Sequence, residues 1–213
     1  MLQSYNNNLE NLTPSAALQI LQHGNERFVN GITKNRDLLS RVGQTEKEQK
    51  PFAAILSCMD SRAPVELLFD QGIGDVFSVR IAGNIISENV LGSLEFAVGV
   101  TGSKLIMVMG HTNCGAVKGA CDKVELGNLT ALLEKISPAV EEACTQGANC
   151  SSADAGFVEK VTRINIKNSI ESIRNQSPLI RSLEEDGKIM IVGALYCVAT
   201  GAVEILNAGD VQA

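Results

Sequence analysis

Two short stretches of the chain carry side chains that can bind a metal ion. The first is Cys58-Met-Asp60-Ser-Arg62, and the second, much later in the chain, is His111-Thr-Asn-Cys114. Two thiols and one imidazole suit a tetrahedral zinc ion, which prefers sulfur and nitrogen ligands. A fourth Cys or His ligand is not obvious, since the other histidine, His23, lies far away in an N-terminal segment. Three protein ligands and one open position are typical of catalytic zinc sites.

Asp60 and Arg62 stand directly after an apolar run, where burial of a charge is costly unless it is paired. We expect the two side chains to pair, because the forked guanidinium of Arg62 matches the carboxylate of Asp60. Asp60 would then be an oriented carboxylate beside the metal. The alternative is an ordinary solvated turn that carries one acidic and one basic residue.

The elements that must position these motifs alternate between apolar strands and helices. Such alternation predicts an α/β fold, with a mainly parallel sheet of four strands, a short antiparallel edge strand and flanking helices. In these sheets, ligands bind beyond the carboxyl ends of the strands, and the two motifs follow the first and third strands. The predicted strands are 52–57, 75–80, 104–109, 188–193 and the short 203–206, and the main predicted helices are 14–31, 63–70, 88–100, 126–146 and 154–175.

Length and composition indicate one globular domain. The chain has 213 residues, of which 45% are hydrophobic and 20% charged, so general disorder is excluded. We expect a single domain over 1–213, with an N-terminal helical arm at 1–31 and an α/β core at 51–213. The net charge of −6 and the lack of a Lys/Arg cluster argue against nucleic acid and anionic membranes as partners. No transmembrane run and no secretory signal are recognised, so we expect a cytoplasmic protein.

The chain contains six cysteines, and they differ in their surroundings. Cys58 and Cys114 lie in the two motifs, whereas Cys121 and Cys197 are expected to be core residues. Cys144 and Cys150 lie in a polar stretch, and they are the two that could form a disulfide under oxidising conditions.

Taken together, the two motifs resemble the paired signature of the β-class carbonic anhydrases. The resemblance continues over most of the chain, in the stretches 16–31, 49–52, 79–84, 94–98 and 192–204. It implies one zinc ion per chain, bound by Cys58, His111 and Cys114, and the reaction CO2 + H2O ⇌ HCO3⁻ + H⁺ through attack of zinc-bound hydroxide. It implies catalytic roles for Asp60 and Arg62. Asp60 either orients the attacking group or closes the site by binding zinc, and Arg62 pulls the carboxylate off the metal.

The same resemblance implies how CO2 is held. Gln49 and the backbone N–H of Gly115 would contact the substrate oxygens. An apolar wall would come from Phe77, Ala82 and Phe96 of a neighbouring subunit. The chain is therefore expected to be a homodimer or a multiple of one. The N-terminal helix, whose apolar stripe is formed by Leu18, Leu21 and Phe28, would be an arm that packs on the partner.

Two other functions stay open at this stage. The nearer one is hydrolysis of carbonyl sulfide or carbon disulfide at the same zinc site, because substrate gating rather than the motif would separate the two activities. The other is a zinc-bound redox or regulatory module with Cys58 and Cys114 as reactive thiols, although such a switch needs neither the Asp60–Arg62 pair nor Gln49. No histidine proton shuttle is expected, because His111 is used as a ligand and His23 is predicted to be on the surface.

Overall fold

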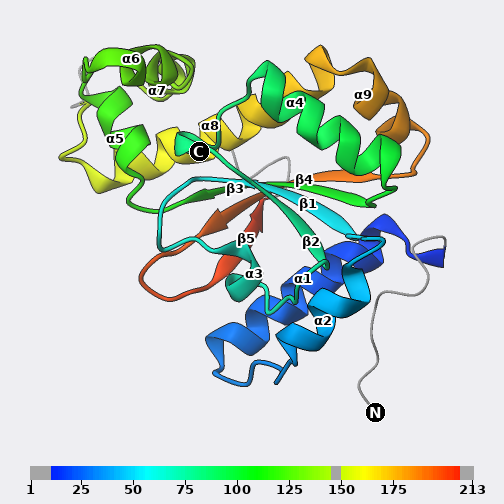
Figure 1. Ribbon diagram of the computed structural model, residues 1–213. Helices are drawn as coiled ribbons and strands as arrows, with labels where there is room; N and C mark the ends of the chain where they lie inside the picture. Colours follow the sequence, from blue (N-terminus) through cyan, green and yellow to red (C-terminus); the bar gives the residue numbers. More distant parts are fainter. Residues whose placement is uncertain (1–10, 145–149, 207–213) are drawn as a thin grey trace.

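A five-stranded sheet forms the centre of the computed structural model, which describes residues 11–144 and 150–206 (Figure 1). The strand order is β2-β1-β3-β4-β5, and the first four strands run parallel while β5 is antiparallel to β4. The predicted fold class is therefore confirmed. The strands are β1 (Ala53–Ser57), β2 (Val76–Arg80), β3 (Leu105–His111), β4 (Met190–Tyr196) and β5 (Val203–Leu206).

Helices cover both faces of this sheet (Figure 1). One face carries α1 (Pro14–Val29), α2 (Leu38–Thr45) and α3 (Val65–Leu68). The other face is larger and carries the remaining helices, which are α4 (Glu88–Glu95), the π-helical turn η4 (Phe96–Val100), α5 (Gly115–Cys121), α6 (Gly127–Glu134), α7 (Ser137–Ala143), α8 (Ala155–Gln176) and α9 (Pro178–Glu185). A short turn of 3-10 helix, η3 (Ala82–Asn84), follows β2.

The central strands are apolar throughout because both of their faces are buried. In β1, Ala54 and Leu56 point into the core beneath α4 and α8, whereas Ala53 and Ile55 point into the core over α1 and α3. This alternation follows from the period of two residues in a strand. It explains why strands in this sheet appear as continuous hydrophobic runs rather than as alternating patterns.

Helix α1 starts as predicted, with Thr13 accepting a hydrogen bond at the N-cap and Pro14 in the first turn. Its apolar stripe, however, packs on the sheet of its own chain. Leu21 is fully buried there, and Leu18 and Phe28 pack partly buried against the same core. The expectation that this stripe lies on a partner subunit is therefore wrong. The buried stripe completes the chain's own core, which lies on the α1 side of the sheet.

Two of the predicted helices need correction, and one helix has no predicted counterpart. The predicted helix over 126–146 is two helices, α6 and α7, and Pro138 lies in the first turn of the second, where its ring is tolerated. The predicted helix over 88–100 changes at Phe96 from α-helix to the π-helical turn η4. Helix α9 was not predicted, although Ser177 caps its first turn and Pro178 follows directly.

Strand β4 lies further along the chain than the predicted 188–193, because it follows β3 to its end. The pairing runs through Gly110↔Leu195 to His111↔Tyr196. The carboxyl ends of β3 and β4 therefore meet at the residue that begins the second motif.

The cysteines outside the two motifs differ from one another. Cys144 and Cys150 form a disulfide, Cys121 is buried as expected, and Cys197 is half-buried rather than a core residue. Within the two described ranges, no helix combines the length and the apolar character that crossing a membrane requires.

Candidate metal centre

The two motifs meet at the carboxyl ends of neighbouring strands. Cys58 follows β1 directly, His111 is the last residue of β3, and Cys114 is the N-cap of α5. Because β1 and β3 are adjacent and parallel, their ends bring the three side chains together. The three potential ligand atoms all lie within 4.8 Å of one another, and all three residues are buried.

The imidazole of His111 is oriented for metal binding. Its Nδ1 lies 2.9 Å from the carbonyl oxygen of Thr112, which can only accept, so Nδ1 carries the proton and Nε2 keeps its lone pair. Nε2 is buried and has no hydrogen-bond partner among the described residues. An unpartnered buried acceptor is costly, and a metal ion between Nε2 and the two sulfurs would satisfy it.

The spacing of the two sulfurs fits the same interpretation. The Sγ atoms of Cys58 and Cys114 are 3.9 Å apart. Two thiolates on a tetrahedral zinc ion, each at about 2.3 Å, would be about 3.8 Å apart. The donor set, the burial and the spacing therefore all fit zinc.

The two thiols differ in acidity because they interact. The pKa of Cys58 is lowered to about 4, mainly by the hydrogen bond from Cys114 and also by the N–H of Gly83, 3.4 Å from its sulfur. The pKa of Cys114 is raised by its hydrogen bond to the Cys58 sulfur and by burial. Of the two thiols, Cys58 is therefore the one that carries the negative charge.

Asp60 and Arg62 form the expected ion pair at the edge of this cluster. Arg62 donates from Nε to Oδ1 at 2.9 Å and from a terminal nitrogen to Oδ2 at 2.7 Å. These hydrogen bonds hold the pKa of Asp60 well below its usual range. The second oxygen, Oδ2, lies 3.8 Å from Nε2 of His111. The carboxylate is thus beside the ligand atoms, while both of its oxygens are engaged by Arg62.

Further residues that support the site were not singled out in the sequence. Arg80 at the end of β2 donates to the carbonyl oxygens of Cys58 and Asp60, and so fixes the turn between them. The hydroxyl of Tyr196 donates to the carbonyl of Arg62 at 3.2 Å. Arg80 stands at the carboxyl end of a strand adjacent to β1, and that placement was the signal that could have revealed it.

The expected substrate residues fall into two groups. Gly115 follows Cys114 directly, and Ala82 precedes Gly83, whose N–H lies 3.4 Å from the sulfur of Cys58. Gln49 is exposed and precedes β1, whereas the cluster follows the other end of that strand. Phe77 is near the amino end of β2, and its ring packs edge-to-face on Phe96, with the ring centres 6.1 Å apart. The chain therefore brings Gly115 and Ala82 to its own cluster, but not the other three.

Comparison with known proteins assigns the family. A family model described as carbonic anhydrase matches residues 53–203, which span the whole sheet up to the start of β5. The chain belongs to the β-carbonic anhydrase family. A carbonic anhydrase of Mycolicibacterium smegmatis is 33% identical over 95% of this chain and 98% of its own length. Carbonic anhydrase 2 of Mycobacterium tuberculosis is 34% identical over 91% of this chain and 93% of its own length.

Solved structures of β-carbonic anhydrases share the fold. The enzyme CafA of Aspergillus fumigatus superposes with a TM-score of 0.70 and 25% identity, covering 92% of this chain and 91% of the other. A tetrameric β-carbonic anhydrase of Sordaria macrospora gives a TM-score of 0.69 at 23% identity, over 79% of this chain and 90% of the other. The resemblance seen in the sequence is confirmed, and the enzyme class is that of the family, whose members are lyases.

Proposed function

We propose that this β-carbonic anhydrase catalyses CO2 + H2O ⇌ HCO3⁻ + H⁺ with one zinc ion held by Cys58, His111 and Cys114. The observation that carries the proposal is the buried, unpartnered Nε2 of His111, which shares a site with two sulfurs at zinc-binding spacing. Zinc held there would supply Lewis acidity, which makes hydroxide available from water near neutral pH. Because two thiolates cancel the charge of the ion, the pKa of water should be lowered less than by three neutral imidazoles.

Asp60 would orient the attacking water or hydroxide. Its Oδ2 is close enough to the ligand atoms to accept a hydrogen bond from that group, which would turn a lone pair toward CO2. Arg62 would keep the carboxylate in this role, because its fork occupies both oxygens and holds them away from the metal. We therefore propose that the arrangement described here is the open, active one.

The proton released by the reaction would leave without a histidine relay. His23 is exposed on α1, on the far side of the sheet from the larger helical layer, and His111 is a ligand. Water and external buffer would carry the proton instead. The N–H of Gly115 would bind one oxygen of bicarbonate at the edge of the site.

The rest of the substrate pocket would come from a second copy of the chain. Phe96 is 48% exposed and Val100 is 73% exposed, and these two apolar residues lie on one helical turn at the end of α4. Gln49 and Phe96 are exposed and lie away from the chain's own cluster, so they would be available to a neighbour, and Phe77 packs against Phe96. The β-carbonic anhydrase of Sordaria macrospora is described as tetrameric, which supports assembly in this family.

The central experiment is a stopped-flow CO2 hydration assay before and after dialysis against a zinc chelator. Activity should disappear with the metal and return with one equivalent of zinc per chain. Activity that survives complete metal removal would contradict the proposal. A parallel assay with carbonyl sulfide shows which of the two substrates the site prefers.

Assembly is tested by Phe96→Glu, followed by light scattering. A charge on this exposed ring position should lower the mass of the assembly and reduce activity, whereas Leu126→Glu, another exposed apolar position, should change neither. Removal of residues 1–30 is a poor test, because it would delete Ala17 and Leu21 from the chain's own core. An active monomer in the parent protein would contradict the shared pocket.

A further inference from the structure

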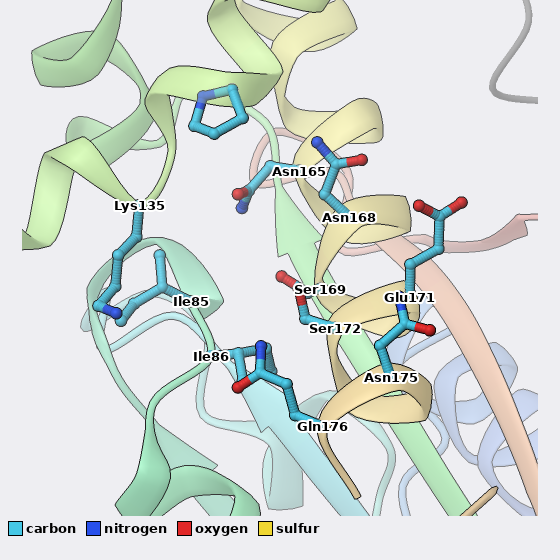
Figure 2. Close-up of a pocket in the computed structure, with 11 residues that line it drawn as sticks. Ile85, Ile86, Lys135, Asn165, Asn168, Ser169, Glu171, Ser172, Asn175 and Gln176 are labelled. Atoms are coloured by element: carbon cyan, nitrogen blue, oxygen red, sulfur yellow. The ribbon is translucent and has the colours of Figure 1, made fainter.

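Helix α8 holds the turn after β2 through two side chains on one of its faces. The amide of Asn165, which is 3% exposed, donates to the carbonyl oxygen of Gly83 at 2.9 Å. One helical turn later, the hydroxyl of Ser169 donates to the carbonyl oxygen of Asn84 at 3.2 Å. Both side chains line a cleft of about 340 Å³ between α8 and the segment that contains Ile85 and Ile86 (Figure 2).

The turn that α8 holds is itself in contact with a metal ligand. The N–H of Gly83 points at the sulfur of Cys58, 3.4 Å away. Gly83 adopts φ +67°, a region that favours glycine, and a Cβ at this position would lie 2.6 Å from Cδ1 of Ile136. Only glycine therefore fits this position, from which the N–H reaches the sulfur.

A hydrogen bond to a ligand sulfur changes the electronic properties of the metal centre. It draws electron density away from the thiolate, and partners of this kind orient the ligand as well. The side chain of Asn165 binds the carbonyl oxygen of Gly83, and the N–H of the same glycine binds the sulfur of Cys58. Gly83 therefore links the side chain in the cleft to the metal ligand.

We propose that Asn165 is a positioning residue of the metal centre, acting through Gly83 on the sulfur of Cys58. The inference rests on the proposed zinc site and adds a residue that does not touch the metal. Ser169 binds the carbonyl oxygen of Asn84, the residue after Gly83, and so does not hold Gly83 directly. Its contribution should therefore be smaller.

The test uses Asn165→Leu, which keeps the size of the side chain and removes its donor. Cobalt(II) replaces zinc in the full chain, because the thiolate-to-cobalt absorption band reports on the sulfur directly. We expect a shifted band and about tenfold weaker zinc binding in a chelator competition. Asn168→Leu is the matched control, because Asn168 lies in the same cleft and its side chain makes no hydrogen bond within the described part of the chain. It should match the parent in both measurements.

A second variant keeps the proposal testable if Asn165→Leu does not fold. Ser169→Ala should shift the band in the same direction by less. An unshifted band and unchanged zinc affinity in a folded Asn165→Leu protein, or in Ser169→Ala when the first variant does not fold, would overturn the proposal. If the parent itself shows no thiolate-to-cobalt band, the proposed zinc site fails instead, and the two failures are thus distinguished.

Discussion

Two buried polar clusters differ in how completely their atoms are paired: one lies beside α1 and α3 on one face of the sheet, and the other lies at the carboxyl ends of β1 and β3. In the first, Asp70, with a side chain only 2% exposed, receives Arg27 on one carboxylate oxygen and Arg36 on the other. The backbone N–H of Lys34 donates to the same carboxylate at 3.2 Å. In the second, Nε2 of His111 is left without a partner among the described residues beside two sulfurs.

The difference separates a structural cluster from a functional one. The Asp70 cluster satisfies itself, so it ties α1, the segment after it and α3 together and has no atom left over for a ligand. The cluster of Cys58, His111 and Cys114 is held in place by its backbone and leaves Nε2 of His111 without a partner among the described residues. Substitutions in the first should therefore change stability, and substitutions in the second should change metal binding and turnover.

The largest effect is expected for Cys58→Ser. A neutral hydroxyl is a far poorer ligand than a thiolate, so zinc affinity should fall by more than about 100-fold, beyond the usual effect of an outer partner. Activity should fall to background with it. Metal analysis and the hydration assay measure both, and Cys197→Ser is the control for the loss of a sulfur. Full zinc content in Cys58→Ser would contradict the ligand assignment.

Asp70→Asn should act on stability instead. Removal of one member of a buried ion cluster leaves two arginines without their anion, which costs about 3–5 kcal/mol of unfolding free energy. Urea unfolding at pH 7 measures the loss, and Asp186→Asn, in an exposed pair with Lys188, should cost about 1 kcal/mol or less. Activity per bound zinc should stay at the parental value in both proteins.

The same comparison predicts a pH dependence. Burial by itself would raise the pKa of Asp70, but the hydrogen bonds from Arg36 and Arg27 outweigh it and the pKa is lowered. A lowered pKa in the folded state stabilises the fold above the unfolded value of about 3.9, and the gain is lost as the pH falls through the lower folded value. Below about pH 4 the unfolding free energy of the parent should therefore fall more steeply than that of Asp70→Asn.

A smaller effect is expected beside the metal. Asp60→Asn should lower kcat about 10- to 100-fold while zinc stays bound. The variant loses the carboxylate that orients the reacting group, but it loses no zinc ligand. Arg62→Ala should also lower activity, since the freed carboxylate can turn and fill the open position. A structure of Arg62→Ala with Asp60 still away from zinc, together with parental turnover, would contradict this account.

The smallest effect is expected at His23. His23→Ala removes an exposed side chain, so turnover at high buffer concentration should stay within about twofold of the parent and stability within about 0.5 kcal/mol. A large loss of turnover there would reveal a proton relay.

Much of the fold could be predicted because its signals are local. The central strands β1 and β3 are buried on both faces and are continuous apolar runs, and the sequence places all four parallel strands within a few residues. The partner of a helix face is not a local property. The stripe with Leu21 is equally suited to a neighbouring subunit and to the chain's own sheet, and only the folded chain shows that it packs on the sheet.

The candidate site, like the fold, has parts that the sequence predicts and parts that it does not. The types of Cys58, His111 and Cys114 and their place after strands predicted a metal cluster. Their supports could not be predicted, because Thr112 and Gly83 contribute backbone groups whose directions depend on the turn. Residue types say nothing about the direction of a backbone carbonyl or N–H, groups that nearly every residue possesses.

The order of the strands has a consequence for how the protein is made. Cys58 follows β1, but His111 ends β3 and Cys114 comes three residues later, and all of β2 and α4 is synthesised between Cys58 and these two. A growing chain that has formed only the pair β1–β2 holds one thiol and no partner ligand. Tight metal capture therefore begins only when β3 has been added along the free edge of β1. In a ribosome-bound chain, metal uptake would mark the moment at which the sheet gains its third strand.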